Sequence, residues 1–203
     1  MKKHIFFDYG RTVVKHPAEA DEILLSRGIT DATQIKALQK TIFSMGEYLN
    51  RLDEGSMTRD AYHEMLKKQL PESILPIALS AADYHIGELL PLPGMEQLLA
   101  KLKKEGFQLY ITSNMDALHS AQMPEVPITR YFDGMIFSAE LGVRKPEKAF
   151  FEAALARFGV TAEDCLFIDD LPENVAGAAA CGIDGLIFRG NADEAMAFIK
   201  QNQ

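Results

Sequence analysis

Carboxylate side chains follow two short apolar segments of this chain. Asp8 comes directly after residues 4–7, and Asp169 and Asp170 come directly after residues 165–168. A strand buried on both faces of a parallel sheet presents the residues that follow it at the carboxyl edge of the sheet, where ligands bind. A carboxylate at that edge could act as a nucleophile. Two adjacent carboxylates repel each other unless a cation compensates, so the pair favours a divalent metal ion; the alternative is helix capping by Asp170 with a solvated Asp169.

A hydroxyl, an amide and a lysine occupy comparable places along the chain. Ser113 and Asn114 follow residues 107–112 and could bind phosphate oxygens, although a helix N-cap explains this segment equally well. Lys145 stands just before a predicted helix, where a single lysine is most often solvated. Asn174 follows the paired acids by four positions. Each signal is weak alone, and their order along the chain gives them weight.

Five short apolar segments predict the strands that position these residues. They are residues 4–7, 107–112, 134–137, 165–168 and 185–188. Helical patterns separate the later strands, at residues 95–104, 146–158 and 172–181, with a glycine close after each. Alternation of strand and helix predicts parallel pairing through right-handed crossovers. We therefore expect an α/β fold with a three-layer, Rossmann-like parallel sheet core.

The stretch from about residue 17 to residue 90 breaks this alternation. Apolar residues recur there at helical spacings, and no segment is a convincing strand. Three methionines suit the interior of these helices: Met45, Met57 and Met65. We expect a core of residues 1–15 plus 91–203 and a helical cap of residues 16–90. A cap inserted after the first strand would lie over the carboxyl edge of the sheet.

The composition is that of an ordinary globular protein. The 203 residues, 47% hydrophobic and 25% charged, can build one core and a small accessory domain. A net charge of -8 argues against general attraction to nucleic acid or to an anionic membrane. No apolar stretch approaches the ~20 residues of a membrane helix. Cys165 and Cys181 are expected to be reduced interior residues, which favours a cytoplasmic location.

The ordered set of motifs resembles the four signature motifs of the haloacid dehalogenase superfamily. The set consists of Asp8 after the first strand, Ser113 after the second, Lys145 before the next helix, and Asp169 with Asp170 after the fourth. The resemblance covers essentially the whole chain, and the helical insert looks like that superfamily's helical cap of the first type. It implies a Mg²⁺-dependent phosphatase, a monomer or homodimer, that acts on a small phosphorylated metabolite such as a sugar phosphate.

The resemblance also implies roles for the polar residues that contact the substrate. Asp8 would be the nucleophile that attacks phosphorus and forms an aspartyl-phosphate. Ser113, Asn114 and Lys145 would bind the phosphoryl group, and Lys145 would neutralise its charge.

A magnesium site follows from the same resemblance. Its ligands would be Asp8, the backbone carbonyl of Gly10, and Asp170. Asp169 would be a second ligand, direct or through water, and Asn174 would lie beside these ligands.

One position departs from the superfamily's common pattern. Most of its phosphatases carry Asp two residues after the nucleophile, where the acid protonates the leaving group and later activates water, but this chain has Gly10. Candidates to replace that acid are Tyr9, Arg11, Asp53 or Glu54 of the cap, and a metal-bound water. A 2-haloacid dehalogenase, which also lacks this acid and works without metal, is the first alternative function. A catalytically weak ligand-binding or scaffold protein is the second.

Overall fold

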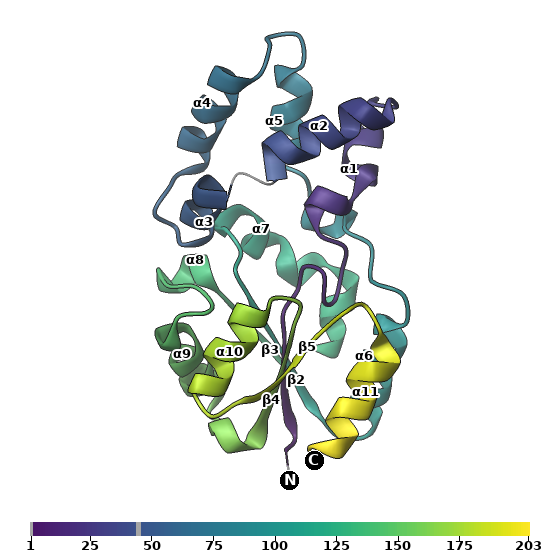
Figure 1. The fold of residues 1–203 in the computed structure, drawn as a ribbon, viewed down its shortest axis with the longest axis vertical. Helices are drawn as coiled ribbons and strands as arrows, with labels where there is room; N and C mark the ends of the chain where they lie inside the picture. The colour runs from purple at the N-terminus through teal and green to yellow at the C-terminus, as the bar shows by residue number, and fades with distance from the viewer. Residues whose placement is uncertain (1, 44–45) are drawn as a thin grey trace.

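The computed structural model, which describes residues 2–43 and 46–203, is built on a five-stranded parallel sheet in the order β3-β2-β1-β4-β5 (Figure 1). The strands are β1 (His4–Phe7), β2 (Gln108–Ser113), β3 (Gly134–Phe137), β4 (Cys165–Asp169) and β5 (Asp184–Ile187). All the predicted strands agree with these bounds to within one residue, and the predicted α/β, Rossmann-like fold is confirmed. Because β1 pairs with both β2 and β4, the residues that follow these three strands lie side by side.

Six helices accompany the sheet after the insert. They are α6 (Met95–Lys104), α7 (Ala117–Gln122), α8 (Ser138–Leu141), α9 (Lys148–Phe158), α10 (Pro172–Ala180) and α11 (Ala192–Gln201). Helices α9 and α10 cover one face of the sheet, and α6 and α11 cover the other (Figure 1). Alternate side chains of β1 pack on opposite faces of the sheet: Ile5 and Phe7 belong to one hydrophobic cluster, and Phe6 belongs to the other. The central strand is therefore buried on both sides, as its apolar run predicts.

Helix α9 begins two residues later than the sequence pattern indicates. The segment before it is a turn, in which the backbone N–H of Glu147 donates to the carbonyl of Arg144 at 2.9 Å. The helix ends at Gly159, whose φ of 66° is a left-handed conformation that favours glycine. The turn matters for the site because it contains Lys145.

The described residues between 17 and 90 form helices and turns and contain no strand. The helices are α1 (Asp21–Leu25), α2 (Ala32–Phe43), α3 (Gly46–Asp53), α4 (Arg59–Gln69) and α5 (Leu75–Ala82). Their predicted interior is largely buried, but Leu25 is 47% exposed. Met65 is buried and Met57 partly buried, while Met45 lies outside the described residues. Figure 1 shows these helices beyond the carboxyl ends of the strands, and we keep the proposal that residues 16–90 are a cap.

Two hydrogen-bonded chain segments join the cap to the core. The backbone N–H of Lys15 donates to the carbonyl of Leu90 at 2.9 Å, and that of Leu92 donates to the carbonyl of Val13 at 3.0 Å. Both segments run close to the end of β1, so the chain leaves and re-enters the core beside the predicted site. No helix among the described residues is long and apolar enough to cross a membrane.

Candidate active site

The ammonium group of Lys145 lies between two buried carboxylates at the carboxyl edge of the sheet. It donates hydrogen bonds to Oδ1 of Asp8 and to Oδ2 of Asp169, both at 2.7 Å. The side chains of Lys145 and Asp169 are fully buried, and Asp8 is 8% exposed. A solvated lysine, the ordinary expectation from the sequence, is therefore excluded. Lysine is almost never fully buried unless it is paired, so this arrangement indicates a built site.

Burial and pairing act in opposite directions on these charges. Burial would lower the pKa of Lys145, but the carboxylates of Asp169 and Asp8 outweigh this effect and raise the pKa, so the ammonium stays charged. Burial raises the pKa of Asp8 to about 7, with Lys145 opposing the rise and Asp169 adding to it. Asp170 stands next to this group, so one ammonium faces three carboxylates.

Asp169 is fully engaged by hydrogen-bond donors of the protein. Besides Lys145, it accepts hydrogen bonds from the side-chain amide of Asn174, at 3.0 Å to each oxygen, and from the backbone N–H of Leu171, at 2.9 Å. Helix α10 is capped at Leu171 without a side-chain hydrogen bond, so capping by Asp170 is also excluded. Asp169 thus holds Lys145 in place and Asn174 holds Asp169, while the predicted contact of these two residues with metal or its water stays a prediction.

The remaining oxygen donors fit a divalent cation. Carboxylate oxygens of Asp8, Asp169 and Asp170 all lie within 4.8 Å of one another. The only ion pair of Asp170 with a described residue is a long one, 4.0 Å to Arg11. No described residue donates a hydrogen bond to the carbonyl of Gly10. Magnesium prefers oxygen ligands of these kinds, so Asp8, Asp170 and the Gly10 carbonyl form the better donor set.

Ser113, the last residue of β2, and Asn114, which follows it, lie beside this centre but have different surroundings. Ser113 is buried, and its hydroxyl makes only a long contact of 3.5 Å with the carbonyl of Asn114, so it is available to a ligand. The side-chain amide of Asn114 instead forms two hydrogen bonds with the backbone of Lys145. Its Oδ1 accepts from the N–H of Lys145 at 2.8 Å, and its Nδ2 donates to the carbonyl of Lys145 at 3.0 Å. Neither residue caps α7, because Asp116 does. Asn114 therefore holds the backbone of the lysine, and its direct binding of phosphate stays a prediction.

A cavity of about 120 Å³ opens from this edge into the space under the cap. Gly10, Ser113 and Asn114 line one part of it, and Tyr9, Ile42, Phe43, Tyr62, Tyr84 and Leu89 are among the apolar and aromatic residues of its wall. The cavity thus combines the polar edge of the sheet with a wall of apolar, aromatic and charged side chains contributed by cap and core.

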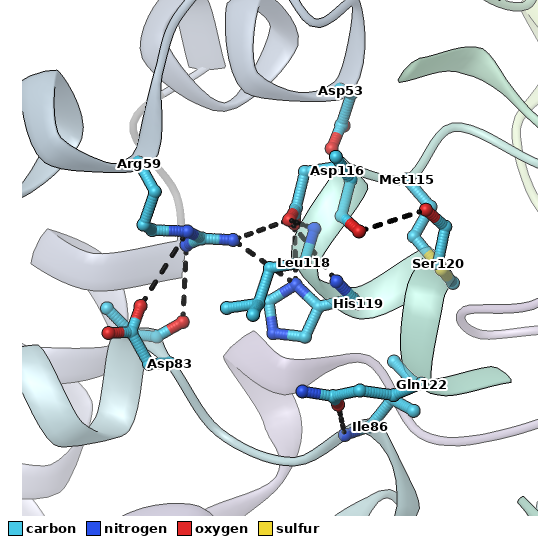
Figure 2. Close-up of polar contacts among 12 residues, drawn as sticks. Asp53, Arg59, Asp83, Ile86, Met115, Asp116, Leu118, His119, Ser120 and Gln122 are labelled. Carbon is cyan, nitrogen blue, oxygen red and sulfur yellow. Dashed lines mark hydrogen bonds and ion pairs between the residues drawn. The ribbon is translucent and has the colours of Figure 1, made fainter. Parts of the chain in front are cut away.

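A charged cluster that the sequence did not reveal lies against the same cavity (Figure 2). Arg59 of the cap donates to Oδ1 of Asp116 at 2.6 Å, and the ring of His119 contacts the other oxygen of Asp116. Burial would raise the pKa of Asp116, but hydrogen bonds and charges from His119 and Arg59 outweigh it and hold the pKa well below the ordinary value. The sequence offered one sign of this cluster, an Asp at a predicted helix start with a His three positions later. The pairing of Asp116 with Arg59 could not be predicted, because it depends on how the cap folds against the core.

Comparison with known proteins adds independent information. A family model described as haloacid dehalogenase-like hydrolase matches residues 3–182. A sesquiterpene phosphatase of Aspergillus oryzae is 31% identical over 157 residues, which cover 76% of this chain and 79% of that protein. A glyceraldehyde 3-phosphate phosphatase of Methanothermobacter thermautotrophicus is 26% identical, over 96% of this chain and 89% of its own length.

Two solved structures share the fold. A haloacid dehalogenase family enzyme from Bacteroides thetaiotaomicron, in complex with magnesium and inorganic phosphate, gives a TM-score of 0.65 at 21% identity, over 98% of this chain and 100% of that one. An L-2-haloacid dehalogenase from Xanthobacter autotrophicus gives a TM-score of 0.70 at 22% identity, over 97% of this chain and 81% of that one.

Proposed function

Because this chain belongs to the haloacid dehalogenase-like hydrolase family, we propose that it is a Mg²⁺-dependent phosphatase of small phosphorylated metabolites, with Asp8 as the nucleophile. The observation that carries the proposal is the ammonium of Lys145, buried between Asp8 and Asp169 at the carboxyl edge of the sheet. Phosphoryl transfer needs positive charge fixed beside the attacking group, and this arrangement supplies it.

The contacts of Asp8 suit a nucleophile. Lys145 bonds to Oδ1, and no described residue donates to Oδ2, which is free to form the bond to phosphorus. The hydroxyl of Ser113 would donate to a phosphoryl oxygen while Lys145 stabilises the negative charge that spreads over these oxygens. Water then attacks the aspartyl-phosphate, releases phosphate and restores Asp8.

Magnesium fits the donor set of this site. Asp8, Asp170 and the Gly10 carbonyl would hold it. When bound, the ion would neutralise charge on the phosphoryl group and favour the ionised form of Asp8. Asp169 supports the same chemistry indirectly, because it fixes Lys145. The structure of similar fold that contains magnesium and phosphate supports this assignment.

The test uses p-nitrophenyl phosphate with and without Mg²⁺. We expect release of phosphate that requires Mg²⁺ and that Asp8→Asn lowers by at least ~10,000-fold, since the covalent route is lost. Glu163→Gln, a change at an exposed carboxyl outside the cavity, is a control for protein preparation and should retain activity. Turnover that is unaffected by chelation of metal, or by Asp8→Asn, would overturn the proposal.

One observation favours a second function. Gly10 offers no acid, as in the 2-haloacid dehalogenases that the sequence resembles at this position. Incubation with 2-chloropropionate decides between the two: release of chloride without phosphatase activity would identify a dehalogenase. The buried pairing of Lys145 and the free carboxylate of Asp170 favour the phosphatase.

A further inference from the structure

Position 10 leaves the proposed reaction without a side chain that transfers protons. Gly10 lines the cavity, and among the described residues a Cβ built there would meet only the ring of His16, at 3.4 Å. The oxygen that leaves phosphorus needs a proton, and the water that attacks afterwards must lose one. Another group in the cavity is therefore required for both transfers.

His16 is close to this position, but its ring is not arranged for the task. The backbone N–H of Ala18 donates to Nδ1 of His16 at 3.2 Å, so the neutral ring carries its proton on Nε2 and would lose this hydrogen bond if it were protonated. Burial, with help from the charge of Arg11, lowers the pKa of His16 to about 4. His16 is thus a neutral hydrogen-bond donor near pH 7.

The cap brings a carboxyl group into the same cavity. Asp53 is the last residue of α3, and it lines the cavity together with Gly10 and Ser113. Its backbone carbonyl accepts a hydrogen bond from the hydroxyl of Ser138, which in turn accepts one from the backbone N–H of Met115 at 2.9 Å. One hydroxyl of the core therefore ties Asp53 to the loop that carries Ser113.

Two further contacts hold this end of α3 against the core. Glu54 faces Arg144 in an ion pair of 3.9 Å. A Cβ added at Gly55 would lie 3.3 Å from the carbonyl oxygen of Ala139, so the backbones approach closely there. Figure 2 shows Asp53 beside the loop of Met115 and Asp116. The core, and not the cap alone, determines where the carboxyl group of Asp53 lies.

We propose that Asp53 carries out both proton transfers of the phosphatase reaction, an inference that rests on the function proposed above. In the first step its carboxylic acid gives a proton to the leaving oxygen, as the bond from that oxygen to phosphorus breaks and the bond from Asp8 to phosphorus forms. In the second step its carboxylate takes a proton from water, as the water oxygen bonds to phosphorus and the bond to Asp8 breaks. Asp53 ends the cycle protonated, as it began it.

The charges around Asp53 suit this alternation. Burial raises the pKa of Asp53 to about 7, and the Asp116 carboxylate adds to the rise, while Arg144 and Arg59 oppose it and Glu54 adds a smaller contribution. An acid whose pKa lies near the working pH is the most effective at both donating and accepting a proton.

The test compares Asp53→Asn with Asp60→Asn, the same change at an exposed carboxyl of the cap that does not line the cavity. With p-nitrophenyl phosphate and Mg²⁺, the nitrophenolate leaves without a proton, so Asp53→Asn should release about one equivalent per enzyme and then turn over ~100-fold more slowly or worse. Acid quenching followed by mass spectrometry should find the phosphorylated enzyme. Asp60→Asn should behave as the wild type.

A second pair of measurements separates a catalytic role from a structural one. Phenyl phosphate has a poorer leaving group, so its wild-type kcat/KM should fall as the pH rises above about 7 and Asp53 loses its proton, and Asp53→Asn should lack this decline. Gly10→Asp, for which there is room, should restore turnover to Asp53→Asn by at least ~10-fold.

Two outcomes would overturn the inference while leaving the phosphatase intact. One is wild-type turnover of phenyl phosphate by Asp53→Asn. The other is a loss of activity with neither phosphoenzyme nor rescue by Gly10→Asp, which would give Asp53 a structural role. By contrast, a wild-type protein that releases no phosphate from any ester would overturn the phosphatase proposal itself.

Discussion

At the scale of single residues, the two adjacent acids at the end of β4 have different surroundings. Asp169 is fully buried and accepts hydrogen bonds from Lys145, Asn174 and the backbone of Leu171. Asp170 is partly exposed, and its one ion pair with a described residue is long. The adjacent positions therefore suit different tasks, with Asp169 fixing the lysine and Asp170 left for metal.

Substitution of each acid should separate these tasks. Asp170→Asn is expected to weaken Mg²⁺ binding by ~10-fold or more, because it removes a ligand. Asp169→Asn should weaken Mg²⁺ binding less but abolish phosphatase activity, since Lys145 loses its anchor. Isothermal titration with Mg²⁺ in the absence of substrate measures the first effect. Equal losses of affinity in both variants would contradict this division.

A residue-scale prediction of stability follows from the raised pKa of Asp53. The pKa is 3.8 for an ordinary Asp and about 7 in the folded protein, so the folded state holds a proton that the unfolded state releases between these values. Stability contributed by this proton is lost as the pH rises from about 4 to 7. Asp53→Asn, which cannot ionise, should therefore raise the melting temperature relative to wild type more at pH 8 than at pH 4. The opposite trend in calorimetry would contradict the raised pKa.

At the scale of elements, the turn that carries Lys145 is held from two sides. On one side, the side-chain amide of Asn114, in the loop after β2, forms two hydrogen bonds with the backbone of Lys145. From α10, Gly177 approaches so closely that a Cβ there would lie 2.4 Å from the carbonyl oxygen of Pro146. A glycine inside a helix is ordinarily unfavourable, so its presence here is explained by this close packing.

Gly177→Ala tests that packing. Helix propensity alone predicts a gain of about 1 kcal/mol, but the contact with backbone predicts a loss of about 1–3 kcal/mol in the free energy of unfolding and a reduced kcat as Lys145 is displaced. Denaturant unfolding and the p-nitrophenyl phosphate assay measure the two effects. Ala176→Gly, at an exposed position of the same helix, should lower the free energy of unfolding only by the difference in helix propensity and should leave kcat unchanged. A stabilised Gly177→Ala protein would show that the turn can move.

The elements were predicted well because their signals are local. Apolar runs that stop at Asp8 or Asp169 mark strand ends, and the glycine after α9 marks the helix end. Partners of polar side chains were predicted less well, because they are distant in the chain. Arg59 meets Asp116 across 57 positions, and Asn114 meets Lys145 across 31. Such pairs depend on how elements that are far apart in the chain pack together, and no local pattern contains that information.

At the scale of the whole molecule, the cap and the core together limit what can react at Asp8. The cavity of about 120 Å³ is lined by residues from both parts, and its wall beyond the sheet edge combines apolar and aromatic side chains with the charged cluster of Arg59, Asp116 and His119. Two hydrogen-bonded connecting segments hold the cap next to β1. The enclosure favours a leaving group of few atoms.

A series of phosphate esters of increasing size tests this limit. We expect kcat/KM for glycerol 3-phosphate to exceed that for flavin mononucleotide by roughly 10-fold or more, because the larger leaving group cannot be enclosed. Phosphate release at several substrate concentrations gives both constants. Preference for the larger ester would indicate that the cap is open when substrate binds.

The hydroxyl of Ser138 links the cap to the loop after β2, since it bonds to both Asp53 and Met115. If Asp53 moves the protons, it leaves together with the cap whenever that link opens, and the phosphorylated Asp8 is then exposed without a base to activate water. An open phosphoenzyme would survive long enough to meet an alcohol acceptor. The contacts that hold Asp53 against the core, this hydrogen bond among them, would thus set the balance between hydrolysis and transfer of the phosphoryl group to another molecule, and a change at Ser138 would shift that balance toward transfer.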